Sequence, residues 1–187
     1  MRTAKGIEQR VHPTMVPKSS SIAQVMGVTN AVTIDGEGIP PITLVGPGAG
    51  GAATASAVVA DIADVARGIR AKPFGRPVDR LRDTRKAPME RHEGGYYIRL
   101  MARDLAGTAA TIATRLAEQK ISLESIVQRR RAAHTTAPEH PVPEAPVPVI
   151  LITYETTETA IRQALDAIKA DGHIASEPQM IRIEPLA

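Results

Sequence analysis

The chain has 187 residues, 43% of them hydrophobic and 23% charged, and a net charge of +3, which suits one large domain or two small ones. It contains no cysteine, which excludes disulfides and Cys-ligated metal sites and is typical of a cytoplasmic protein. Only 2% of the residues are aromatic, and no segment is long and apolar enough to span a bilayer, so neither nucleic acid nor a membrane is an expected partner.

The first part of the chain predicts a small sheet that lacks a core of its own. Residues 12–17 are expected to be extended because each residue before a proline is pushed out of the α region. A short helix is predicted over residues 22–26, followed by strands over 28–35 and 42–45. A region of about seventy residues is marginal without further support. We therefore expect it to pack against something outside this chain.

His12 is a candidate metal ligand or base in this first part. It has no His, Asp or Glu neighbour at a ligand spacing. An ordinary polar or packing role is therefore favoured for this side chain.

A glycine loop, Gly46-Pro47-Gly48-Ala49-Gly50-Gly51, connects the second strand to a predicted helix over 54–67. Its glycines permit positive φ and let a ligand approach the backbone, and free N–H groups at the helix start can bind an anion. The spacing of Gly46, Gly48 and Gly51 matches G-x-G-x-x-G. However, no second parallel strand with an acidic residue follows, so spacing alone favours a packing turn over a dinucleotide fingerprint.

The residues themselves resemble the end of the catalytic region of homoserine dehydrogenase. The segments that carry this resemblance are Val11-His12-Pro13-Thr14, Val16-Pro17, Asn30-Ala31-Val32, the glycine loop and TASAVVADI at 54–62. The resemblance implies an NAD(P)-dependent oxidoreductase that interconverts L-homoserine and L-aspartate 4-semialdehyde in threonine, methionine and isoleucine biosynthesis. It also implies that the cofactor is contacted by Gly46, Gly48, Ala49, Gly50 and Thr54.

The segment 72–93 contains three prolines and seven Arg or Lys residues. Such a composition does not bury enough apolar surface to fold by itself, so an interdomain linker is favoured over an anion-binding patch. The predicted domains are therefore residues 1–71, the linker 72–93, and residues 94–187.

The last region predicts a ferredoxin-like βαββαβ unit, in which two helices cover one face of a four-stranded antiparallel sheet. The alternating or helical spacing of apolar residues supports each element. The first helix has Ala109, Ile112, Ala113 and Leu116 at helical spacing. The elements are strands over 95–103, 121–130, 148–154 and 179–184, a helix over 108–119, a proline-rich loop over 132–146 and a helix from 156 onward. The fold class is thus α+β, with a partial α/β segment preceding this unit.

This unit resembles the ACT regulatory domain in Tyr97-Ile98-Arg99-Leu100, Asp104-Leu105-Ala106-Gly107, residues 121–126 and Gln128. The resemblance implies an amino-acid effector, most directly threonine, bound at a dimer interface by Asp104, Ala106, Gly107, Thr108 and Gln128. A carboxylate can bind an ammonium group, and N–H groups at a helix start can bind a carboxylate. Chemistry alone favours Asp104 as a turn residue that caps the helix. Ala106 stands where the family often has proline.

In homoserine dehydrogenase, the nucleotide-binding domain and the catalytic lysine precede the part that this chain resembles. We therefore assign no catalytic or metal-binding residue, and we expect this chain alone to bind no cofactor and to be inactive. We expect a homodimer through residues 94–187, with 121–127 as a pairing strand. The alternative is a stand-alone amino-acid-sensing or dimerisation module without catalysis.

Overall fold

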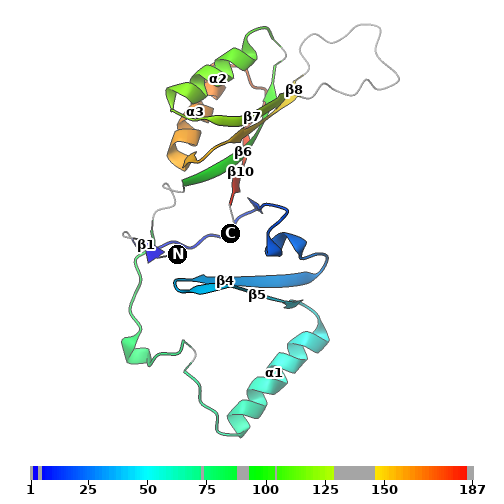
Figure 1. Ribbon diagram of the computed structural model, residues 1–187, viewed down its shortest axis with the longest axis vertical. Coiled ribbons are helices and arrows are strands. Elements are labelled where there is room, and N and C mark those ends of the chain that lie inside the picture. The colour runs from blue at the N-terminus through cyan, green and yellow to red at the C-terminus, as the bar shows by residue number, and fades with distance from the viewer. Residues whose placement is uncertain are drawn as a thin grey trace, which may run out of the picture. The chain divides into compact units, whose positions relative to one another are not determined.

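The computed structural model describes residues 2–3, 6–72, 74–87, 93–103, 105–128 and 146–184 (Figure 1). The chain forms two compact units. The sheet unit combines residues 1–16 with 86–185, and the hairpin unit consists of residues 17–85. Residues 1–16 were expected to belong to the first region, but they are part of the sheet unit, in which Thr14 and Met15 pair with the C-terminal strand. Within the described residues, no helix is both long and apolar enough to cross a bilayer.

The sheet unit is built on strands in the order β3-β10-β6-β8-β7. Neighbouring strands are antiparallel except for β3, which runs parallel to β10. The short strand β9 (Thr156–Thr157) also pairs with β6. The strands of the main order are β3 (Thr14–Met15), β6 (Glu93–Ala102), β7 (Leu123–Gln128), β8 (Val147–Thr153) and β10 (Gln179–Ile183).

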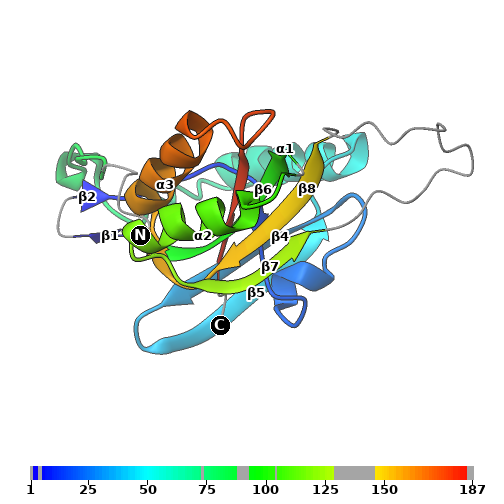
Figure 2. The same ribbon diagram turned by 90° about the horizontal axis from the view of Figure 1, so that it is seen from above.

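Two helices, α2 (Thr108–Glu118) and α3 (Glu158–Ala170), lie on one face of this sheet (Figures 1 and 2). The predicted βαββαβ plan is therefore confirmed. The proline-rich loop predicted over 132–146 lies almost entirely outside the described residues.

The core of the sheet unit follows the alternation of β6, in which every second side chain faces the helices. From β6 these are Tyr96, Ile98, Leu100 and Ala102, each at most 1% exposed. The facing residues of the other elements are Ile112, Leu116, Ile121, Val149, Leu151, Ile161, Ala164, Leu165 and Ile168. The buried stripe of α2 runs through Thr108, Ile112 and Leu116. Ala109 and Ala113 are exposed, so their spacing did not identify the inner face.

A buried carboxylate lies at the start of α3. Thr157 caps this helix by accepting a hydrogen bond from the Ala160 amide at 3.2 Å, and the next residue, Glu158, is only 4% exposed. Arg182 of β10 and Arg162 of α3 both donate to Glu158, from Nε atoms at 3.0 Å. Nearby, burial and then the negative charge of Glu158 raise the pKa of Tyr96 to about 12. The ion pair between Glu158 and Arg182 links α3 to the sheet.

The hairpin unit contains two antiparallel strands and a long helix. Strand β5 begins at Ile39, earlier than the predicted start at 42, because the outer side of a two-stranded hairpin tolerates Pro40 and Pro41. The helix begins at Gly51, three residues before the predicted start. The elements are η1 (Ser21–Gln24), β4 (Thr29–Gly36), β5 (Ile39–Pro47), α1 (Gly51–Ala66) and η2 (Val78–Arg80). A second small hairpin, β1 (Arg2–Thr3) with β2 (Gly6–Ile7), belongs to the sheet unit.

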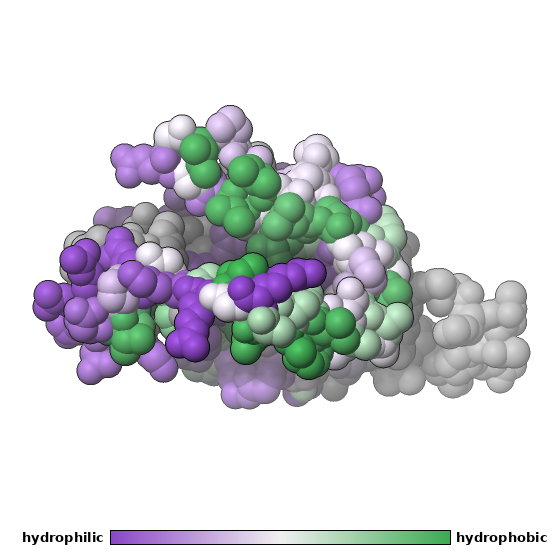
Figure 3. Space-filling view, turned by 90° about the horizontal axis from the view of Figure 1, so that it is seen from below, coloured by the Kyte–Doolittle hydropathy of each residue, from purple (hydrophilic) through white to green (hydrophobic). Residues whose placement is uncertain are grey.

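Apolar side chains of the hairpin unit face outward. Among its described residues, no hydrophobic side chain is buried. Val32 of β4, Leu44 of β5 and Ile62 of α1 are 61%, 62% and 62% exposed. Figure 3 shows hydrophobic side chains gathered over these elements. Monomeric soluble proteins rarely expose so much apolar surface without a partner, which supports the expectation that this unit packs against something outside the chain.

Candidate functional sites

The glycine loop turns the chain sharply from β5 into α1. Gly50 has φ 118°, a conformation that side chains disfavour, and its carbonyl accepts the Thr54 amide at 3.1 Å as the first helical bond. Gly48 lies against Asn30 of β4, because an added Cβ would be 1.9 Å from Asn30 Nδ2. At Gly46, an added Cβ would meet nothing within 4 Å. Gly48 is thus required by packing and Gly50 by its backbone conformation.

Other positions of this loop are open to solvent. Gly50 and Gly51, like Gly46, have space where a side chain would stand, and the first residues of α1 are exposed. Ala49 and Thr54 are exposed as well. An anionic group such as a dinucleotide phosphate fits an exposed backbone at a helix N-terminus. The cofactor-binding role of these residues stays a prediction.

A cavity of about 320 Å³ lies at the start of α2. Gly107, Thr108 and Gln128, which were predicted to bind an effector, all line it. Ala106 does not line it, and Asp104 lies outside the described residues. The structure thus brings together the end of β6, the first turn of α2 and the end of β7. The remaining lining residues are Ala102, Arg103, Leu105, Ala109, Ala110, Ile112 and Val149.

Gly107 shapes the entry of the chain into α2. Its φ of 92° places it in the left-handed region, where a side chain is strained. Its carbonyl accepts the Thr111 amide at 2.9 Å, and the Thr108 amide bonds to the Leu105 carbonyl at 3.2 Å. This local geometry turns the Thr108 position, only 5% exposed, inward at the start of the helix.

The loop after α3 contacts two residues that line this cavity, Arg103 and Thr108. His173 Nδ1 lies 3.3 Å from the Thr108 hydroxyl, and the His173 carbonyl accepts the Arg103 amide at 2.8 Å. Arg115 of α2 holds the same loop through two 2.8 Å hydrogen bonds to the Asp171 carboxylate. These hydrogen bonds lower the pKa of Asp171. The sequence does not predict a role for His173 or Asp171, because no local pattern joins them to Thr108.

The described residues that line the cavity provide one cation, two neutral polar groups and an apolar wall. The Arg103 guanidinium suits a carboxylate, while the Thr108 hydroxyl and the Gln128 amide both donate and accept hydrogen bonds. Leu105, Ile112 and Val149 provide apolar surface. This combination suits a small molecule that carries a carboxylate and a short apolar portion.

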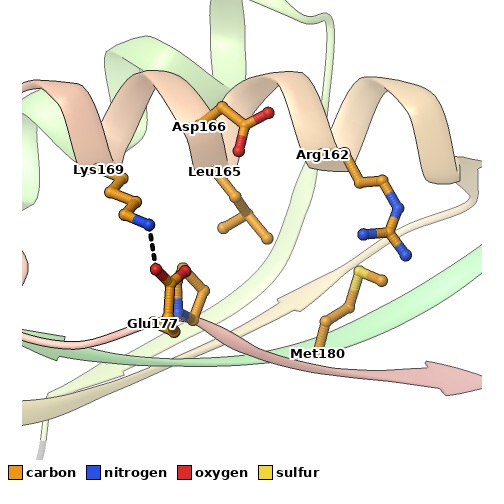
Figure 4. A pocket seen from close by; sticks show the side chains of 7 residues that line it. Arg162, Leu165, Asp166, Lys169, Glu177 and Met180 are labelled. Atoms are coloured by element: carbon orange, nitrogen blue, oxygen red, sulfur yellow. Dashed lines mark hydrogen bonds and ion pairs between the residues drawn. The ribbon is translucent and has the colours of Figure 1, made fainter.

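A second, smaller cavity of about 180 Å³ lies between α3 and β10. Figure 4 shows Leu165 pointing from α3 toward Met180, with an ion pair between Lys169 and Glu177 at one end. Arg162, at the other end, is paired with Glu158. Lys169 and Arg162 are thus both neutralised within the protein. For this reason the cavity provides a matched control for ligand binding at α2.

His12 has a polar role in the structure. Its Nδ1 lies 2.8 Å from the Thr14 hydroxyl and 3.0 Å from the Pro13 carbonyl. In the described part of the chain, no group of three or more His, Cys, Asp or Glu side chains is placed to hold a metal ion.

Comparison with known proteins finds homoserine dehydrogenases. Residues 1–63 match the sequence model of a family described as homoserine dehydrogenase. Homoserine dehydrogenases of Pseudomonas aeruginosa and Neisseria gonorrhoeae are 38% and 37% identical to the chain, and each match covers 99% of it. The crystal structure of a homoserine dehydrogenase from Thiobacillus denitrificans matches all of the chain, with a TM-score of 0.79 and 38% identity. The chain is homologous to the C-terminal portion of homoserine dehydrogenase.

The match with homoserine dehydrogenase runs through both units. The chain spans 42% of the length of the two curated relatives and 41% of the solved chain. More than half of each homoserine dehydrogenase therefore lies outside the match. The resemblance predicted from the sequence is confirmed over the whole chain.

Proposed function

We propose that this chain is part of an NAD(P)-dependent homoserine dehydrogenase, and that it comprises the end of the catalytic region and an ACT regulatory unit. The observation that carries this proposal is 38% identity over nearly the whole chain to an enzyme of which the chain spans 42%. The exposed apolar surface of the hairpin unit agrees with it, since the remaining part of the enzyme would cover that surface. The complete enzyme would interconvert L-homoserine and L-aspartate 4-semialdehyde in the cytoplasm.

In that enzyme, the glycine loop would hold part of the cofactor. The residues concerned are Gly46, Gly48, Ala49, Gly50 and Thr54, which run from the end of β5 into the first turn of α1. The open backbone of this turn would orient an anionic group of NAD(P). When bound, the nicotinamide supplies the hydride acceptor. We assign neither a nucleotide-binding domain nor a catalytic lysine to the described residues.

The chain by itself is expected not to oxidise homoserine. Homoserine at saturating concentration, with NAD or NADP, should give reduced nicotinamide at no more than the uncatalysed rate. The P. aeruginosa relative under the same conditions is the positive control. Turnover above background, in a preparation free of host enzyme, would contradict this prediction.

The sheet unit would supply regulation. We infer that the cavity at α2 takes an amino acid, with threonine the first candidate, and that two copies associate through the sheet unit. In β7, Ile126 and Val127 are 46% and 42% exposed, as expected for a strand that another copy covers. A second candidate function is a stand-alone amino-acid-sensing or dimerisation module. It is favoured by the buried core of the sheet unit, which this chain's own residues complete.

Threonine is expected to stabilise the sheet unit against heat. At about one hundred times its dissociation constant it should contribute about 2.7 kcal/mol and raise Tm by several degrees. Thr108→Val, which removes the hydroxyl at nearly constant volume, and Gln128→Ala should both reduce the shift. Lys169→Ala, in the second cavity, should leave it unchanged.

A thermal-shift series over the common amino acids measures this effect, and sedimentation of the chain reports the dimer. Absence of a shift with every amino acid would contradict effector binding. A monomer at all concentrations would contradict the dimer. An equal shift in Thr108→Val, Gln128→Ala and the wild type would place the ligand outside this cavity.

A further inference from the structure

The N-terminal segment is the outer strand of the sheet unit. Strand β3 pairs in parallel with the end of β10, so that Thr14 lies beside Arg182 and Met15 beside Ile183. The Met15 carbonyl also accepts the Glu184 amide at 3.0 Å. This segment therefore covers part of the strand edge that β10 would otherwise present to solvent.

Side chains and a second backbone contact hold the segment in place. Arg10 Nη1 lies 2.9 Å from Glu184 Oε1, and Arg10 also pairs with Glu8. Further back, the Ile7 carbonyl accepts the Ala87 amide at 3.0 Å. The segment is thus attached both to the end of the sheet and to the stretch that leads into β6. The chain leaves the sheet unit after Val16 and returns to it at Lys86. The hairpin unit is therefore an insertion in the sequence of the sheet unit.

The two outer strands of the sheet differ in their capacity to pair further. Strand β3 has two residues and is flanked by Pro13 and Pro17, which lack the N–H needed to continue a ladder. Short edge strands and edge prolines are two ways in which natural proteins prevent edge-to-edge association. Strand β7 has six residues, no proline, and exposed Ile126 and Val127. Among the described residues, β3 thus offers little backbone for further pairing, whereas β7 offers six residues without a proline.

We propose that residues 10–17 are an edge cap, which occupies the end of β10 so that a second copy of this chain cannot add to the sheet there. The cap is this chain's own segment, and the partner it excludes is another copy. Release of the cap exposes the backbone of β10 and provides a second site of association. The inference does not depend on the proposed effector or on the size of the wild-type assembly, because it concerns the change that follows release.

Met15→Pro tests the cap, with Met15→Ala as the matched control. Proline removes the backbone N–H of a paired residue, whereas alanine changes only a side chain that is 41% exposed. In Met15→Pro, the Glu184 amide should exchange with solvent faster by about tenfold or more. Sedimentation velocity over a concentration series should then show species larger than those of the wild type. Met15→Ala should match the wild type in both measurements.

Arg10→Ala provides a second test that leaves the strand backbone intact. It removes the ion pair to Glu184 and should change amide exchange and sedimentation in the same direction as Met15→Pro, to a smaller extent. If Met15→Pro loses its helical circular dichroism, the result for Arg10→Ala decides. Faster Glu184 exchange with unchanged sedimentation would overturn the proposal. Unchanged Glu184 exchange in a folded Met15→Pro would overturn it as well.

Discussion

Replacing Glu158 with glutamine is expected to lower the free energy of unfolding of the sheet unit by about 3–5 kcal/mol. Glu158 is 4% exposed and accepts hydrogen bonds from Arg182, whose side chain is itself only 13% exposed. Glutamine retains the volume but leaves the Arg182 guanidinium buried without a countercharge. Denaturant unfolding followed by circular dichroism measures the loss.

The matched control is Arg162→Ala, which removes the other partner of Glu158. The Arg162 side chain is 64% exposed, and exposed ion pairs contribute only about 0–1 kcal/mol. We therefore expect a small effect from this variant and a large one from Glu158→Gln. Equal effects, or a loss below about 1 kcal/mol for Glu158→Gln, would show that the pair to Arg182 is not the stabilising contact.

The same carboxylate predicts the direction of the pH dependence. Burial raises the pKa of Glu158, but hydrogen bonds from Arg182 and Arg162 outweigh burial and lower the pKa below its ordinary value. A group with a lowered folded-state pKa stabilises the fold fully above its unfolded pKa of about 4.3 and loses this contribution as the pH falls through its folded pKa. Below about pH 4.3, the wild type should therefore lose more stability than Glu158→Gln.

Gly48→Val is expected to raise the KM for the cofactor by about tenfold or more in a complete homoserine dehydrogenase that carries this region, which corresponds to at least about 1.4 kcal/mol. An added Cβ at Gly48 would lie 1.9 Å from Asn30 Nδ2 and 2.9 Å from Asn30 Cβ. A rotation of the amide does not relieve the second contact, so the loop must move. Steady-state kinetics with varied cofactor measures the effect.

Two variants separate displacement of the loop from direct obstruction of the ligand. Gly46→Ala adds a methyl group that meets nothing within 4 Å, so any effect on KM would report contact with the cofactor. Asn30→Gly combined with Gly48→Val removes the overlapping side chain and should restore KM if displacement is the cause. A normal KM and normal activity in Gly48→Val would show that the loop is only a packing turn.

The local pattern of residues was sufficient to predict most of the sheet unit. Alternation along 95–103 and helical spacing along 108–119 identify β6 and α2, because a buried face repeats every two residues in a strand and about every 3.6 in a helix. The order of these elements then indicates the βαββαβ plan. Gly107, Thr108 and Gln128 could be placed at one cavity only through the family resemblance, since they belong to separate elements.

The contacts that required the folded chain join segments far apart in the sequence. Three examples are the pairing of Thr14 with Arg182, the contact of His173 with Thr108 and the ion pair of Arg182 with Glu158. A two-residue strand such as β3 has no periodicity to detect, and a buried ion pair is indistinguishable in sequence from two surface charges. Periodicity reports which face of an element is apolar, whereas these pairings depend on how the elements are arranged around a common core.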